Sequence, residues 1–413
     1  MPAITSTVAP HASSHERLLA LDVFRGMTVA AMLLVNNPGS WSAIYPPLAH
    51  AAWHGWTPTD LIFPFFLFIV GVTTHLSLDA RRSHGADDRA IARQIFKRGA
   101  LIYVLGLALN GFPYFDPVPG SFWGSIISRF GISPVTHESL LGTIRILGVL
   151  QRIAIVYVCA ALISVCTTIR QQAIIAVVLL VGYWLLMTAV PVPGEGAAGA
   201  ALLNEPARTL AAYVDRAVLG RHIYHGTAFW DPEGILSTVP AIVTAMLGIF
   251  AGRWIGQPSS LPHRIAGLFA IGSLGMVAGL TWGWVFPINK QLWTSSYVLF
   301  TGGMACVVLA TCTWLIDLRH QIKWTKPFVP FGINPMIAFV GSGLMARTIY
   351  TLWRVESEQP GKYISIQAAI FGNFFLSWVA EPRLASFMFA LTFVFVWWAI
   401  LVLLQRRRII LKV

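Results

Sequence analysis

Long uncharged apolar runs, separated by short polar segments, recur along nearly the whole chain. An apolar run of about 20 residues is long enough to cross the hydrocarbon core of a bilayer as an α-helix. The pattern therefore predicts an all-α polytopic membrane protein with about ten transmembrane helices. The predicted spans are residues 18–35, 60–78, 99–115, a run containing 145–157, 172–190, a run starting after 234, 266–286, 293–316, 328–349 and 384–404.

The basic residues predict which loops face the cytoplasm, because Lys and Arg concentrate on that side of a membrane. The loop after the second predicted span is strongly basic, and so is the carboxy-terminal segment 406–413. Both termini are therefore predicted to be cytoplasmic, which requires an even number of crossings. Residues 364–380 are accordingly assigned to an external amphipathic or re-entrant helix, not to an eleventh span.

The same pattern predicts one transmembrane domain, residues 18–405, between two cytoplasmic tails. Residues 1–17 lack the charged start and the cleavage pattern of a signal peptide, and we expect a disordered tail there. Residues 406–413 form the basic tail. The predicted external loops are residues 38–59, 116–140, 191–233 and 350–383.

Composition supports this class and excludes others. Of the 413 residues, 56% are hydrophobic and only 11% are charged, far from the average of soluble proteins. The net charge of +12 resides in particular loops, so it reports topology and no nucleic-acid partner is expected. All four cysteines lie in or at the ends of apolar runs, and neither a disulfide nor a metal site is expected.

The stretch 48–68 carries the most suggestive chemistry. No Lys or Arg occurs between Pro38 and Asp60, which is typical of an external loop, and Trp53 is one of several aromatic residues expected at the headgroup level. His50 lies in this loop, ahead of Asp60 at the mouth of the second predicted span. An imidazole can take a proton near neutral pH as a general base, or carry an acyl group as a nucleophile.

Two neighbours of His50 suggest supporting roles. Asp60 could orient the imidazole, and Asn36, at the end of the first predicted span, could stabilise a developing oxyanion. His54 follows His50 by four residues, a spacing also found in metal sites, but no Cys or Glu nearby completes such a site. The alternative is that His50 is an ordinary hydrogen-bonding residue at the interface.

Polar residues elsewhere suggest ligand binding within the membrane. Arg145 and Arg152 are seven residues apart, which would place both on one helix face, next to Gln151. They are interpreted as facing a hydrated cavity, and the alternative is that they snorkel to the rim. Asp231 belongs to a polar external segment, and Asn334 belongs to FGINP, which predicts a broken helix beside a cavity.

Several long motifs, in the same order, resemble the heparan-alpha-glucosaminide N-acetyltransferase family and its bacterial relatives, the transmembrane acyltransferases. The resemblance covers nearly the whole chain. It rests on LDVFRG, LLVNNPG, HAAWHGWTPTDLIFPFFLFIVG, RILGVLQRIAIVY, YVDRAVLG, DPEGILSTVPAIV, PINKQLWTSSYV and FGINPM.

The resemblance implies transfer of an acetyl group from cytosolic acetyl-CoA to the amine of a glucosamine-like amino sugar on the external side. It also implies His50, Asn36 and Asp60 as catalytic residues and a homodimer in the bilayer. A bacterial inner-membrane location is expected, with a periplasmic acceptor. The residues expected to bind the acceptor are His54, Trp53, Arg145, Arg152, Gln151, Asp231 and Asn334.

The donor must be reached from the opposite side of the membrane. We expect the CoA head to stay at the inner mouth, beside basic residues that can form charge-assisted hydrogen bonds with its phosphates, while the pantetheine arm threads inward. The residues assigned to this mouth are Asp22, Arg25, Lys97, Arg98 and Arg253. For Asp22 and Arg25, three residues apart, the alternative is a structural ion pair.

Two other functions fit part of the pattern. A transporter of a sugar or lipid-linked solute would explain the broken ninth span and the intramembrane charges. O-acetylation of a polysaccharide would use the same machinery on a hydroxyl acceptor.

Overall fold

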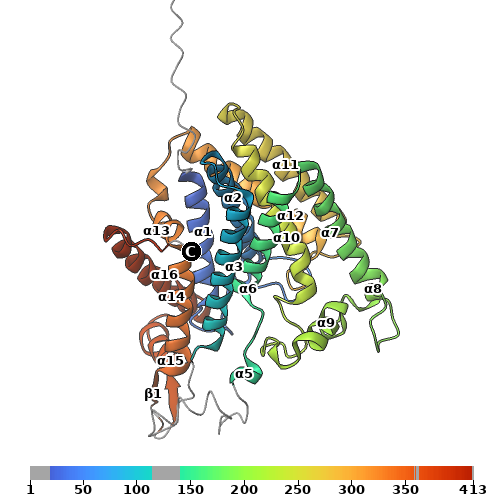
Figure 1. Ribbon diagram of the computed structural model, residues 1–413. Helices are drawn as coiled ribbons and strands as arrows, with labels where there is room; N and C mark the ends of the chain where they lie inside the picture. The colour runs from blue at the N-terminus through green and yellow to red at the C-terminus, as the bar shows by residue number, and fades with distance from the viewer. Residues whose placement is uncertain (1–18, 114–139, 358, 360–361, 412–413) are drawn as a thin grey trace, which may run out of the picture.

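The computed structural model describes residues 19–113, 140–357, 359 and 362–411 (Figure 1). The predicted tail 1–17 and most of the predicted loop 116–140 lie outside the described residues. The longer helices are α1 (Leu19–Asn36), α2 (Ile62–Ser83), α3 (Asp88–Gly111), α6 (Val149–Cys166), α7 (Ile169–Ala189), α10 (Ile235–Ile255), α11 (Leu261–Trp282), α12 (Ser295–Thr313), α14 (Pro335–Arg347) and α16 (Pro382–Arg406).

Short elements connect these helices, and all of those labelled in Figure 1 except α13 lie toward the lower end of the bundle. One antiparallel two-stranded hairpin pairs Arg354 with Ser365. The short elements are α5 (Leu140–Thr143), α8 (Gly199–Leu202), α9 (Leu210–Leu219), α13 (Val329–Ile333), β1 (Arg354–Glu356), β2 (Tyr363–Ser365) and α15 (Ile366–Ile370).

The described residues contain eight helices that are long and apolar enough to cross a membrane. The chain is therefore an all-α, multi-pass membrane protein, as its apolar runs predict. These helices are α1, α2 with its leading turn, α6, α7, α10, α11, α12 with its π-helical extension to Leu318, and α16. The predicted span 99–115 falls largely in the second half of α3, whose first turns are charged, and 328–349 falls in α13 and α14.

Burial separates central helices from peripheral ones. In the most apolar segment of each span, 67% of the residues of α10 and 61% of those of α12 are buried inside the protein. The corresponding shares are 28% for α7 and 22% for α11. α10 crosses α2 at close range, and two glycines permit this. A Cβ on Gly71 would meet the Ala245 carbonyl oxygen at 2.0 Å, and one on Gly248 would meet the Phe68 oxygen at 2.0 Å. Any larger residue would force these central helices apart.

The segment 328–349 is a broken helix, as its glycines and proline predict. α13 ends at Ile333, Asn334 has non-helical dihedrals, and α14 begins with Pro335. Asn334 is buried, and its amide binds the carboxy-terminal tail: Nδ2 donates to the Ile409 carbonyl at 3.1 Å and Oδ1 accepts from Leu411 N at 3.2 Å. The freed backbone beside the break is thus covered by the end of the chain.

The segment assigned to an external or re-entrant helix is short. α15 and a π-helical continuation cover Ile366–Leu376, too few residues to cross a bilayer. Exposed aromatic residues lie in this segment and just after it, among them Phe374 and Trp378. Its length agrees with leaving it out of the count of spans.

Candidate active site

A tight turn at the start of α2 fixes Asp60. Pro58–Leu61 forms a 3-10 turn, and the Asp60 carboxylate folds back over it. Asp60 Oδ2 accepts from the backbone N–H of Thr57 and of Ala51, both at 3.0 Å. Tyr297 of α12 donates its hydroxyl to the Asp60 carbonyl. The side chain of Asp60 is 1% exposed, so its remaining oxygen has one fixed direction.

That oxygen faces His50. Asp60 Oδ1 lies 2.7 Å from His50 Nδ1. Because the carboxylate oxygen is an acceptor, Nδ1 carries the proton and Nε2 is left with its lone pair. A buried carboxylate that orients a partly exposed imidazole is the arrangement of a general base or a nucleophile.

A lysine from a distant part of the chain completes the group. Lys290 Nζ lies 3.0 Å from His50 Nδ1, 3.3 Å from Nε2 and 3.6 Å from Asp60 Oδ1. Its segment, between α11 and α12, is held against the histidine loop: Gly55 N donates to the Ile288 carbonyl at 2.8 Å. Burial lowers the pKa of Lys290 below its ordinary value, and Asp60 opposes this only in part.

His50 and Lys290 border a cavity of about 200 Å³. Its polar lining includes Asn36, His50, Glu233 and Lys290. The rest of the wall is largely apolar, which excludes water and strengthens electrostatic interactions inside. The apolar lining comes from α1, α2, α6 and α14: Met32, Val35, Ile62, Phe63, Phe66, Val149, Leu150, Ile153, Met336 and Phe339.

A second cavity, of about 510 Å³, begins where the first ends. Phe66, Ile153 and Met336 line both, so these side chains stand between the two. Arg25 and Arg98 contribute the charged lining of the second cavity. Arg25 lies in the early turns of α1, whereas Asn36, in the first cavity, is the last residue of the same helix. The two cavities therefore follow each other along the bundle.

The carboxy-terminal tail forms part of the second cavity. Ile410 and Leu411 line it beside Ile333 and Pro335 at the helix break. The paired hydrogen bonds from Asn334 hold this tail in place. A buried Nε–H of Arg98 has no hydrogen-bond partner among the described residues, and its guanidinium lies over the Tyr157 ring at 5.0 Å.

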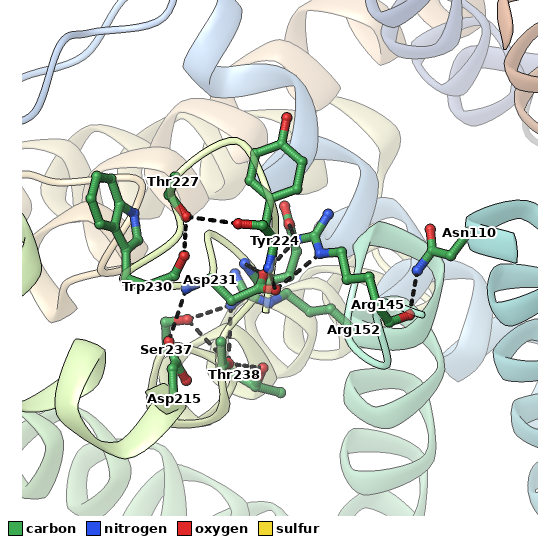
Figure 2. Close-up of polar contacts among 12 residues, drawn as sticks. Asn110, Arg145, Arg152, Asp215, Tyr224, Thr227, Trp230, Asp231, Ser237 and Thr238 are labelled. Carbon is green, nitrogen blue, oxygen red and sulfur yellow. Dashed lines mark hydrogen bonds and ion pairs between the residues drawn. The ribbon is translucent and has the colours of Figure 1, made fainter. Parts of the chain in front are cut away.

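An acidic loop before α10 presents Glu233 to the first cavity. Figure 2 shows Asp231 of this loop beside Arg145. Arg145 holds this loop: it forms ion pairs with Asp231 and Glu233, with a hydrogen bond of 2.9 Å from Nε to Asp231 Oδ2. Burial alone would raise the pKa of Glu233, but Arg145, Arg152 and Lys290 together outweigh it, and the pKa lies below the ordinary value.

Two further residues brace the loop from behind. Asp215 of α9 accepts from the backbone N–H of Asp231 at 3.1 Å and of Ile235 at 2.9 Å, and burial raises the pKa of Asp215 to about 6. Arg152, fully buried, donates to the Gly234 carbonyl at 3.3 Å and to the Ser237 hydroxyl. Figure 2 shows both meeting the loop from the side opposite Tyr224.

A family model described as "Heparan-alpha-glucosaminide N-acetyltransferase, catalytic" matches residues 17–260, which is more than half of the chain. The chain belongs to this family.

Two curated relatives carry the same name. The heparan-alpha-glucosaminide N-acetyltransferase of Mus musculus is 28% identical over 404 residues, covering 86% of this chain and 58% of the mouse protein. That of Homo sapiens is 27% identical over 395 residues, covering 84% of this chain and 56% of the human protein. The chain thus spans just over half the length of these family members.

The structure brings together the residues predicted to be catalytic in this family member. His50 and Asn36 line the first cavity, and Asp60 is hydrogen-bonded to His50. Their proximity is a finding of the structure, and their catalytic role stays a prediction.

The predicted acceptor residues lie behind or beside the cavity and do not form its wall. Arg145 precedes α6, which begins only at Val149, so the prediction that it shares a helix face with Arg152 is wrong. Both arginines instead hold the acidic loop: Arg145 pairs with the buried Asp231, and Arg152 donates to the Gly234 carbonyl. Gln151 is buried against Gly106.

The other three predicted acceptor residues also have protein partners. Trp53 Nε1 donates to the Leu203 carbonyl at 2.7 Å, and His54 Nε2 lies 2.9 Å from Asn204 Oδ1. Asn334 binds the carboxy-terminal tail, as described above. In each case a nearby polar group of the chain satisfies the side chain that sequence reasoning left free for a ligand.

The predicted donor residues divide into three groups. Arg25 and Arg98 line the second cavity together. Asp22 lies behind them, 3.2 Å from Arg25, as their spacing predicts. Lys97 is exposed on α3 and does not line the cavity, whereas Arg253 lines a different hollow between α10 and α11.

Sequence reasoning missed Lys290 and Glu233 as site residues. Both lie inside motifs that carry the family resemblance, PINKQ and DPEG. The available signal is a lysine in a connection that the sequence predicts to be external and that has few basic residues. Only the fold shows that this connection meets the histidine loop.

Proposed function

We propose that this family member transfers an acetyl group from acetyl-CoA to the amine of a glucosamine-like amino sugar. The observation that supports this best is the His50–Asp60 pair at a cavity that continues into a second, arginine-lined cavity. A donor made on one side of a membrane needs such a path to reach an imidazole near the other side. We place the second cavity on the cytoplasmic side and His50 on the periplasmic side of a bacterial inner membrane.

The second cavity would take the CoA head and pantetheine arm. Arg25 and Arg98 are the charged groups there, and a guanidinium suits phosphate because its N–H groups match phosphate oxygens. The thioester would then pass Phe66, Ile153 and Met336 into the first cavity. Met is the flexible member of this trio and can change rotamer to admit a thin chain.

The chemistry follows from the tautomer that Asp60 imposes. His50 Nε2 takes a proton from the acceptor ammonium, and the resulting amine attacks the thioester carbonyl carbon. The C–S bond then breaks, and the imidazolium gives its proton to the CoA thiolate. The freed imidazole takes the second proton from the amide nitrogen and releases it to water, giving an N-acetyl sugar, free CoA and one proton. In the covalent variant Nε2 itself takes the acetyl group first and passes it to the amine.

Two polar groups of the cavity can stabilise the oxyanion formed on attack. Lys290 Nζ lies 3.3 Å from Nε2, so an ammonium stands beside the atom that reacts. Asn36, at the end of α1, supplies an amide to the same cavity. Preorganised donors aimed at developing charge are commonly the largest single contribution to catalysis.

The direct test is an acetyl-transfer assay. Membranes that contain the full chain are incubated with labelled acetyl-CoA and either glucosamine, galactosamine or glucose. N-acetylated product is expected with the amino sugars and not with glucose. Transfer to glucose alone would indicate an O-acetyltransferase, and uptake of sugar without any acetylated product would indicate a transporter.

Replacing Lys290 by Met should lower kcat about 10²-fold with little change in KM, because an oxyanion donor acts mainly in the transition state. The ammonium must be protonated to act, and burial lowers the pKa of Lys290. The alkaline decline in activity should therefore lie below the ordinary lysine pKa of about 10.4. The measurement is a pH–rate profile of membranes at saturating acetyl-CoA.

Lys290→Arg is the matched variant, because a guanidinium keeps its proton to higher pH. It should retain part of the activity and move the alkaline decline upward. An alkaline decline that is the same in the parent and in Lys290→Arg would remove Lys290 from this role.

A further inference from the structure

A groove of about 620 Å³ opens between α7 and α11, over α10 and α12, away from both cavities of the active site. Small side chains, among them Ala173, Ala251 and Ala278, leave this space open. α7 and α11 are the two least buried spans beside it, and Val177 and Leu274 are 60% and 70% exposed. The groove therefore faces the hydrocarbon of the bilayer.

Polar groups gather at one end of the groove, where α10 ends and α7 begins. Arg253 and Gln257 line this end, together with Trp254. Among the described carboxylates, none forms an ion pair with Arg253. Trp254 Nε1 donates to the Arg264 carbonyl at 2.9 Å, which fixes the indole as a wall of the groove. A cation thus stands at the head of an apolar trough.

A cation at the end of an apolar groove is complementary to an anionic lipid of the surrounding bilayer. Basic pockets between transmembrane helices bind anionic lipid head groups, and a guanidinium pairs with phosphate in a bidentate manner. We propose that the groove binds an anionic glycerophospholipid, with its phosphate on Arg253 and an acyl chain along the trough. This site is independent of the proposed acetyl transfer.

A second copy of the chain fits the same surface less well. In a two-fold dimer both copies use the same patch, so a partner for Arg253 would have to come from the helices around the groove. α7, α10, α11 and α12 contain no Asp or Glu, and Asp317, in the π-helical extension of α12, does not line the groove. A dimer through this face would bring arginines together without a carboxylate to pair them.

The test compares lipids on the purified full chain in neutral detergent. Native mass spectrometry would count bound phosphatidylglycerol and phosphatidylcholine during titration. Phosphatidylglycerol should bind more tightly to the parent, and Arg253→Gln should weaken it about tenfold while leaving phosphatidylcholine unchanged. Arg253→Lys, which keeps the charge, should retain most of the affinity.

Two further variants serve as controls. Arg170 is exposed in the first turn of α7 and does not line the groove, so Arg170→Gln should bind like the parent. Ala278→Phe should weaken both lipids because it fills the trough. Equal binding of the two lipids by the parent, or parent-like binding by both Arg253 variants, would overturn the proposal. So would crosslinking of Leu274→Cys between two chains, which would identify a second copy as the occupant.

Discussion

Replacing His50 by Ala is expected to reduce acetyl transfer by about 10²–10⁴-fold, because the variant lacks the group that moves the proton or carries the acetyl. The side chain is partly exposed, and Lys290 Nζ stays 3.6 Å from the Asp60 carboxylate that His50 contacts, so the fold should persist. Acetyl-CoA should still raise the unfolding temperature of the variant, since a ligand that binds the folded state stabilises it. The measurements are turnover in membranes and thermal unfolding with and without acetyl-CoA.

His54 provides the matched control. It lies on the same loop and binds Asn204 and Asn289, but it does not line the cavity. His54→Ala should therefore change turnover only a few-fold. Turnover of His50→Ala close to that of His54→Ala would exclude His50 as base or nucleophile.

Replacing Arg145 by Ala is expected to destabilise the protein by about 3–5 kcal/mol, the usual cost of removing one partner of a buried ion pair. Two carboxylates would lose their counter-charge at once, and Asp231 is fully buried. The acidic loop would then no longer hold Glu233 at the cavity, so activity should fall as well. Thermal unfolding in detergent and turnover in membranes would measure both effects.

Arg208 is a suitable control because, like Arg145, it pairs with two carboxylates, but it does so at the surface. It pairs with Glu195 and Glu205, but its side chain is 44% exposed. Exposed ion pairs contribute roughly 0–1 kcal/mol, so Arg208→Ala should unfold close to the parent temperature. Similar losses in the two variants would show that burial of the Arg145 cluster does not matter.

The helical plan of the protein follows from its sequence because each span is a local property. A run of apolar residues identifies a helix without knowledge of its neighbours, and the break at Asn334 follows from Pro335 and the adjoining glycine. Helix ends are less certain. The run predicted to begin at residue 266 begins at Leu261, because His263 and Arg264 extend the helix beyond its apolar part.

The active site is only partly a local property. His50 and Asp60 are ten residues apart, and the turn that joins them can be inferred from Thr57 and Pro58. Lys290 reaches His50 across a separation of 240 residues, which no short motif reveals. The sequence assigns Arg145 and Asn334 to a ligand because it does not show the protein groups that bind them, Asp231 and the carboxy-terminal tail.

The region matched by the family model ends at residue 260, but the wall of the first cavity does not. Lys290, Met336 and Phe339 all come from beyond that point. A fragment that stops at the end of α10 would keep His50 and Asp60. It would lose Lys290 and part of the wall of the first cavity. Dissection of such chains at that boundary should therefore yield pieces that work only when both halves are produced together.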